Sequence, residues 1–157
     1  MNGLHLTADL SGCACDDQLL LDAAALQAQC EAAVAEAGLQ GVATLFHAFA
    51  PESDGHGSPA GPTAAQASRG LPASGVTGVV LLAESHLAVH TWPELRSVTL
   101  DVYVCNRSAD HSTRARTLLK RLIDAFEPAQ TLHHALQRGT LAPAGPAGPG
   151  LTPPVAR

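Results

Sequence analysis

Positively charged residues are scarce in this chain of 157 residues. Nine Lys and Arg stand against fourteen Asp and Glu, and the formal net charge is −5. Proteins that bind nucleic acid or an anionic membrane usually carry basic patches or runs, and the sequence has no basic run. The composition therefore argues against both partners and better suits a small polar or cationic substrate.

Long apolar segments are also absent. No stretch approaches the roughly 20 residues of a membrane-spanning helix, and the residues after Met1 lack the charged and apolar blocks of a secretory signal peptide. We therefore expect a cytoplasmic protein with no membrane partner. In such a reducing compartment the four cysteines are expected to stay free thiols.

The apolar pattern predicts one α+β domain over residues 1–140, built as an antiparallel sheet with helices on one face. The chain is 46% hydrophobic, enough for a core of its own. Residues 4–10 alternate apolar and polar side chains, as a half-buried strand does. Further strands are predicted at 42–49, 76–84, 86–92, 97–104 and 130–137.

Two helices are predicted between these strands. Apolar residues repeat at helical spacing over 19–37, where Asp16 or Asp17 can cap the start and Gly38 is placed to end the helix. A second amphipathic helix is predicted over 112–126.

Two segments have a different composition, rich in Gly, Pro and Ala. Residues 52–74 are predicted to form a flexible insertion, either a tolerated surface loop or a lid over the site. Residues 141–157 repeat Ala-Pro and Gly-Pro and are predicted to be a disordered tail.

The most informative segment is 79–94. An apolar strand leads without a turn signal into Glu84, Ser85 and His86, and His90 follows in the same extended pattern. Polar groups at the end of a buried strand cost free energy unless they have hydrogen-bond partners, so their presence here indicates a functional site. Alternation puts both histidines on one face, where they could approach a common site. Their spacing also fits two metal ligands on a helix, but the segment favours a strand and no third ligand is evident, so no metal is predicted.

This segment, Glu-Ser-His followed by His-Thr-Trp-Pro-Glu, resembles the processing and active-site segment of the short bacterial and archaeal S-adenosylmethionine decarboxylases. Those enzymes carry a self-generated pyruvoyl group. The resemblance covers roughly residues 3–138, and it implies two protomers in an α/β/β/α sandwich with active sites across the homodimer interface. Other matching motifs occur in order at 3–10, 12–13, 46–49, 75–78 and 101–105.

The family chemistry explains the residue types. Decarboxylation leaves a carbanion, which needs an electron sink that ordinary side chains lack, and no pyridoxal site is identifiable. The resemblance implies that the hydroxyl of Ser85 attacks the carbonyl of Glu84, that the chain is cleaved there, and that Ser85 becomes the pyruvoyl cofactor, which forms a Schiff base with the substrate. It also implies that Thr77, commonly serine in relatives, and His90 assist processing, and that Cys105 donates a proton to the decarboxylated substrate.

For substrate binding, the resemblance places Phe49 and Trp92 around an adenine ring and Glu94 on the ribose hydroxyls. The alternative is that the two aromatic residues only pack the sheet and that Glu94 is a surface carboxylate.

The predicted function is decarboxylation of S-adenosylmethionine, which supplies the aminopropyl donor for spermidine. Residues 95–99 depart from the aromatic and glycine-rich stretch usual in relatives. Two alternatives therefore stay open, a pyruvoyl-dependent arginine or ornithine decarboxylase and a catalytically silent regulatory homologue.

Overall fold

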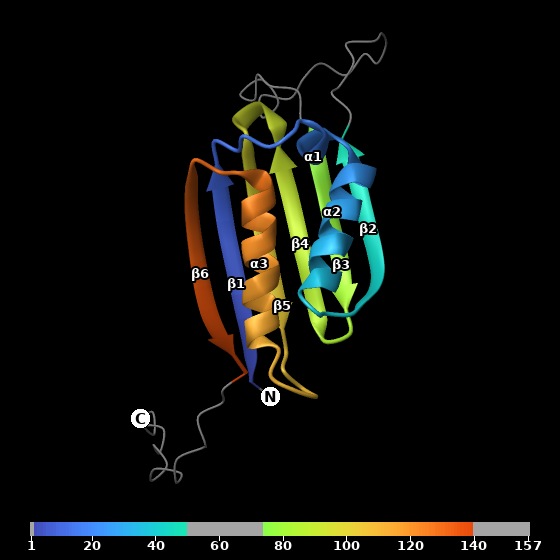
Figure 1. Cartoon of the computed structure of the whole chain (residues 1–157), viewed down its shortest axis with the longest axis vertical. Coiled ribbons are helices and arrows are strands. Elements are labelled where there is room, and N and C mark those ends of the chain that lie inside the picture. The colour runs from blue at the N-terminus through green and yellow to red at the C-terminus, as the bar shows by residue number, and fades with distance from the viewer. Residues whose placement is uncertain (1, 50–73, 140–157) are drawn as a thin grey trace, which may run out of the picture.

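Within residues 2–49 and 74–139, which the computed structural model describes, six antiparallel strands form one sheet in the order β2-β3-β4-β5-β1-β6 (Figure 1). The strands are β1 (Gly3–Ser11), β2 (Gly41–Phe49), β3 (Gly75–Leu82), β4 (Ser85–Trp92), β5 (Ser97–Val104) and β6 (Gln130–Arg138). The predicted strands are present, although β3 ends at a turn two residues before the predicted boundary. The predicted insertion and tail lie outside the described residues, apart from Ser74.

One-sided burial explains the register of the central strands. In β5 the side chains of Val98, Leu100, Val102 and Val104 are buried, while the residues between them are half-exposed on the opposite face. The same alternation runs along β1, which pairs with β5 from Leu4 to Leu10. A slip by one residue would turn the apolar set toward solvent, so the pattern fixes the pairing.

The helices cover one face of the sheet, as predicted. They are α1 (Gln18–Leu21), α2 (Ala23–Glu36) and α3 (Ser112–Phe126), and a 3₁₀ turn, η1 (Pro93–Leu95), joins β4 to β5. Helix α2 lies over β2 and β3, and α3 lies over β1 and β5 (Figure 1). None of the described helices is long and apolar enough to cross a membrane.

The prediction of a single helix over 19–37 is wrong in one respect, because the helix is interrupted at Asp22. The carboxylate of Asp22 accepts hydrogen bonds from the N–H groups of Ala24 at 2.7 Å and Ala25 at 3.2 Å. Asp22 is therefore the N-cap of α2 and has an extended backbone. Gly38, with φ +71°, follows the helix end as predicted.

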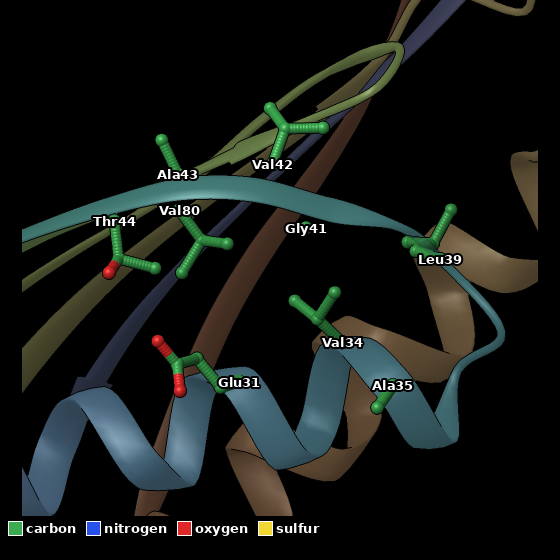
Figure 2. Close-up of a pocket in the computed structure, with 9 residues that line it drawn as sticks. All are labelled: Glu31, Val34, Ala35, Leu39, Gly41, Val42, Ala43, Thr44 and Val80. Atoms are coloured by element: carbon green, nitrogen blue, oxygen red, sulfur yellow. The ribbon is translucent and has the colours of Figure 1, made fainter.

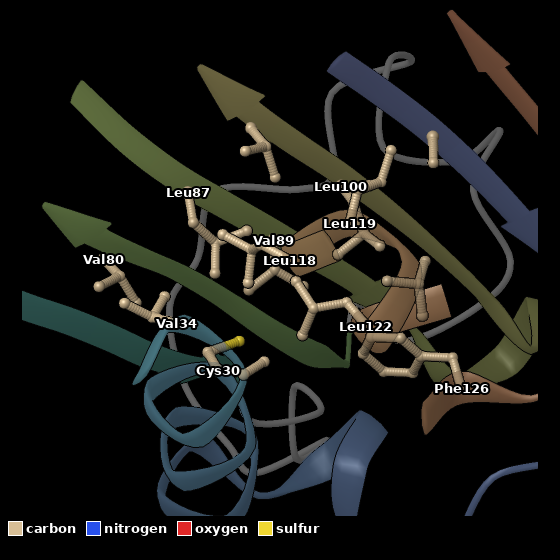
Figure 3. Packing of buried hydrophobic residues seen from close by; sticks show 14 of the residues in the cluster. Cys30, Val34, Val80, Leu87, Val89, Leu100, Leu118, Leu119, Leu122 and Phe126 are labelled. Atoms are coloured by element: carbon tan, nitrogen blue, oxygen red, sulfur yellow. The ribbon is translucent and has the colours of Figure 1, made fainter. Parts of the chain in front are cut away.

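The core lies between the helices and the sheet (Figure 3). Leu122 and Phe126 of α3 and Leu87 and Val89 of β4 are fully buried. Cys30 of α2 is also fully buried, and this burial raises the pKa of its thiol to about 12. Cys30 therefore behaves as a small apolar residue.

The face of the sheet opposite the helices carries large apolar side chains that are exposed. Leu45, Leu81, Leu132 and Leu136 are 70%, 46%, 58% and 59% accessible. They lie on β2, β3 and β6, on both sides of the central strands β4, β5 and β1. Exposed apolar side chains of this number and size indicate an interaction surface.

Candidate active site

The turn between β3 and β4 carries the predicted cleavage position. Leu82 pairs with Ser85, so Ala83 and Glu84 form the turn. Ser85 has φ 131°, a backbone conformation that L-amino acids with a side chain rarely adopt. Strain of this kind persists where the surrounding contacts enforce it, and it concentrates at functional positions.

The main-chain carbonyl of Glu84 has a hydrogen-bond donor. The N–H of Cys105 donates to this oxygen at 3.2 Å. A donor here would stabilise negative charge that develops on the oxygen when a nucleophile attacks the carbonyl carbon.

The side chain of Glu84 is held by the loop that precedes α3. Its Oε2 accepts from the N–H of Arg107 at 2.8 Å, and its Oε1 accepts from the N–H of Ser108 at 2.9 Å. Hydrogen bonds from Ser108, and then from Arg107, lower the pKa of Glu84, and nearby His111 adds to this effect. The side chain is therefore ionised near neutral pH.

The structure brings three predicted site residues together at this end of the sheet. Ser85 pairs with Val104, the neighbour of Cys105 in the chain. The thiol of Cys105 lies 4.0 Å from Oε2 of Glu84 and is half-buried. Glu84, Ser85 and Cys105 thus form one cluster, which we call the junction cluster.

Thr77 and His90 form a separate pair. They are opposite each other on β3 and β4, and Oγ1 of Thr77 lies 3.1 Å from Nδ1 of His90. His90 follows Ser85 by five residues in an extended strand, which separates them by about 17 Å at roughly 3.4 Å per residue. Within one chain, the two predicted processing residues therefore do not reach Ser85.

The predicted substrate-binding residues lie near the Thr77–His90 pair, at the opposite end of β4 from the junction cluster. The rings of His90 and Trp92 have centroids 6.2 Å apart, and Phe49 is opposite Gly75 at the end of β2. Phe49 is 47% and Trp92 37% accessible, so neither is buried in the core.

Glu94 lies in η1, beyond the end of β4, and is exposed. The hydroxyl of Ser74 donates to its Oε2 at 3.4 Å. The carboxylate therefore keeps capacity to accept further hydrogen bonds.

His86 and His90 do not share a site, contrary to the expectation from their spacing. Nε2 of His86 lies 3.4 Å from Oδ1 of Asp101, whose Oδ2 is 2.7 Å from Nε2 of His5. His86 thus contacts β5, whereas His90 contacts Thr77 of β3, and the two histidines have no common partner among the described residues. No group of three or more potential metal ligands occurs in the part of the chain that the structure describes.

Two structural residues near the substrate side were not identified from the sequence. Thr91 is 5% accessible, and its hydroxyl accepts from the N–H of Val76 and donates to the carbonyl of Leu20, both at 2.7 Å. The Thr91 side chain on β4 thus links β3 and α1 through hydrogen bonds. Its position between His90 and Trp92 within a recognisable motif was the only signal in the sequence.

Arg96 is the second such residue, and it lies within the stretch that departs from the family pattern. Its guanidinium donates to the carbonyl oxygens of Cys13 and Cys15, both at 2.7 Å, and pairs with Asp17. These contacts fix the β4–β5 connection, which carries Glu94, against the start of α1.

Replacing Thr91 by valine should destabilise the fold with little change in shape. The N–H of Val76 and the carbonyl of Leu20 would both lose a buried partner, and each unsatisfied group costs about 1–3 kcal/mol. We expect the free energy of unfolding to fall by about 2–4 kcal/mol, measured by urea denaturation. Thr131→Val, at an exposed position of β6, is the control, and equal midpoints for the two variants would contradict this role.

A cavity of about 370 Å³ lies away from these groups, between α2 and the edge strand β2 (Figure 2). Val34 and Leu39 line it with Val42 and Val80, and Glu31 is its only charged residue among the lining side chains. It holds none of the predicted site residues.

Comparison with known proteins assigns the chain to an enzyme class. The family model described as S-adenosylmethionine decarboxylase matches residues 4–139. The chain belongs to this family. The predicted class, a decarboxylase of S-adenosylmethionine, is thereby confirmed, and the alternatives receive no support.

Individual relatives agree with this assignment. The S-adenosylmethionine decarboxylase proenzyme of Archaeoglobus fulgidus is 28% identical over 137 residues, which cover 87% of this chain and 97% of the relative. The proenzyme of Picrophilus torridus is 30% identical over 138 residues, covering 88% and 85%. The crystal structure of the adenosylmethionine decarboxylase from Aquifex aeolicus superposes with a TM-score of 0.68 and 28% identity, covering 92% of this chain and 96% of that one.

Proposed function

We propose that the chain cleaves itself between Glu84 and Ser85, and that Ser85 becomes the pyruvoyl group with which the enzyme decarboxylates S-adenosylmethionine. The observation that carries this proposal is the strained backbone of Ser85 directly after a carbonyl that accepts a hydrogen bond from Cys105. The product would supply the aminopropyl donor for spermidine synthesis, as expected for this family. A cytoplasmic location stays a prediction.

Cleavage would begin when the hydroxyl oxygen of Ser85 attacks the carbonyl carbon of Glu84. The C–N bond breaks and an ester forms, while the N–H of Cys105 stabilises the charge on the carbonyl oxygen. A base then removes the α-proton of residue 85, and the carboxylate of Glu84 leaves with the ester oxygen. Water converts the remaining dehydroalanine to the pyruvoyl group and releases ammonia.

The base for this elimination is His90, and we propose that it comes from a second copy of the chain. The separation of about 17 Å along β4 excludes the same chain's His90 unless the strand unfolds. The exposed apolar side chains of β2, β3 and β6 are suited to pack against another sheet in an α/β/β/α homodimer. With the two copies related by a two-fold axis and running in opposite directions, the Thr77–His90 pair of one would face the junction cluster of the other.

The junction cluster suits the proposed cofactor. When formed, the pyruvoyl group supplies the electron sink for the carbanion. The thiol of Cys105 lies beside position 85 and can deliver the proton that completes the reaction.

The substrate side would be formed by Phe49, Trp92 and Glu94. The exposed aromatic faces can stack on adenine, and the carboxylate can accept hydrogen bonds from both ribose hydroxyls. In the proposed dimer these residues come with Thr77 and His90 from the partner copy.

A substrate panel tests this assignment. Carbon dioxide release from S-adenosylmethionine should far exceed release from arginine or ornithine at equal concentration. Glu94→Gln should raise KM for S-adenosylmethionine by about tenfold with a smaller change in kcat, because the lost hydrogen bonds involve a charged acceptor. Glu36→Gln, an exposed carboxylate on α2, is the control. Faster turnover of a basic amino acid would overturn the substrate assignment and leave the cleavage chemistry intact.

A further inference from the structure

We propose that the loop from Cys105 to Ser112, the 105–112 loop, is a binding site for the carboxyl end that cleavage creates at Glu84, and that His111 holds this end beside Cys105. The inference rests on the proposed self-cleavage. It assigns His111 as a positioning residue for the reaction, with no contact to the substrate.

The loop has its own internal hydrogen bonds. Oδ1 of Asn106 accepts from the N–H of His111 at 2.9 Å, and Nδ2 of Asn106 donates to Oγ of Ser112 at 3.1 Å. Asn106 has φ 48°, which turns the chain sharply after β5. The loop is thus closed by hydrogen bonds of the Asn106 side chain, which cleavage of the junction would leave intact.

Four groups of the loop converge on the carboxylate of Glu84. The N–H groups of Arg107 and Ser108 donate to its two oxygens, one to each. Nε2 of His111 lies 3.7 Å from Oε2, and the thiol of Cys105 lies 4.0 Å from the same oxygen. Backbone N–H groups arranged in this way form an anion-binding concavity.

Cleavage changes what holds Glu84 in place. In the intact chain it is fixed by its bond to Ser85 and by the preceding residue, since the N–H of Ala83 donates to the carbonyl of Gln40 at 2.9 Å. After cleavage Glu84 is a chain end with two carboxylates in place of one. The loop contacts then become the main attachment of this residue, and the local negative charge increases.

His111 is placed to compensate for that charge. Its side chain is 16% accessible, and its Nδ1 is buried with no hydrogen-bond partner among the described residues. A buried nitrogen of this kind can take a further hydrogen-bond partner, which none of the described residues supplies. His111, Glu84 and Arg114 line one cavity of about 260 Å³, which gives the new terminal carboxylate room next to an imidazole and a guanidinium group.

Retention of this end matters for Cys105. While Glu84 stays on the loop, its side chain accepts from the thiol and orients the S–H group. If the end is released, the thiol loses that partner and proton delivery becomes less accurate. More turnovers should then end with the pyruvoyl group converted to alanine, which inactivates the enzyme.

Hydrogen–deuterium exchange with mass spectrometry, applied to the cleaved protein, tests the proposal. We expect His111→Ala and His111→Gln to accelerate exchange in the peptide that ends at Glu84 by about five- to tenfold, because local opening is no longer opposed by the loop. Both variants should also inactivate after fewer turnovers. Arg116→Ala, an exposed residue of α3 outside this cavity, is the matched control.

The same histidine substitutions in a Ser85→Ala background separate positioning from general stability. There the junction stays intact, and exchange at Glu84 should not change. Equal acceleration in the intact and cleaved proteins would overturn the inference, as would cleaved variants with normal exchange and lifetime. A wild-type chain that never cleaves would overturn the proposed function as well.

Discussion

Ser85→Ala is expected to leave the chain in one piece and without activity. Without the hydroxyl no ester can form at Glu84, so neither the cleavage nor the pyruvoyl group follows. Denaturing mass spectrometry should find a single species near 16.1 kDa, whereas the wild type gives fragments 1–84 and 85–157. Carbon dioxide release from S-adenosylmethionine should be undetectable.

Ser11→Ala is the control, because Ser11 is an exposed residue at the end of β1. It should be cleaved and active like the wild type. A purified active enzyme that consists only of the uncleaved chain would refute the pyruvoyl mechanism. Cleavage of Ser85→Ala at the same bond would refute the role of the hydroxyl.

Two inactive variants should complement each other if the active site is shared between two copies. His90→Ala alone should stay uncleaved, because each junction cluster would lack its base. Coexpressed with Ser85→Ala, a mixed dimer contains one complete site, made by Ser85 of the first variant and His90 of the second. The His90→Ala chain should then be cleaved in that dimer, and up to one site per mixed dimer should be active.

Differently tagged chains and mass spectrometry would identify which chain is cleaved. Double variants that carry both substitutions, coexpressed with Ser85→Ala, provide the control, because no complete site can assemble. Efficient cleavage of His90→Ala expressed alone would show that His90 is not the base. A mixed dimer in which both chains remain intact would contradict the shared site.

The fold could be predicted from the sequence wherever a strand or helix has one buried face. The alternation in β1 and β5 and the spacing of apolar residues in α3 gave the correct elements, because burial of one face is a local property of the pattern. The break at Asp22 was missed. The periodic apolar positions continue through it, and only the capping hydrogen bonds distinguish two helices from one.

The site was harder to predict because its geometry depends on residues distant in the sequence. Ser85 and His90 are close in the sequence, but extended backbone separates them, and the hydrogen bond of Thr77 with His90 crosses to another strand. The contacts of Arg96 with Cys13 and Cys15 join residues more than 80 positions apart, so no local sequence pattern predicts them. The hydrogen bonds from the 105–112 loop to Glu84 are likewise seen only in the structure.

The different burial of the four cysteines has a practical consequence for chemical labelling. Cys13, Cys15 and Cys30 are buried, and burial raises the pKa of all three thiols, so near neutral pH they are both shielded and protonated. Cys105 is the one cysteine that is partly accessible, and it adjoins the junction cluster. A maleimide or iodoacetamide reagent should therefore modify the folded protein at one position, and the extent of labelling would count the chains whose Cys105 thiol is accessible.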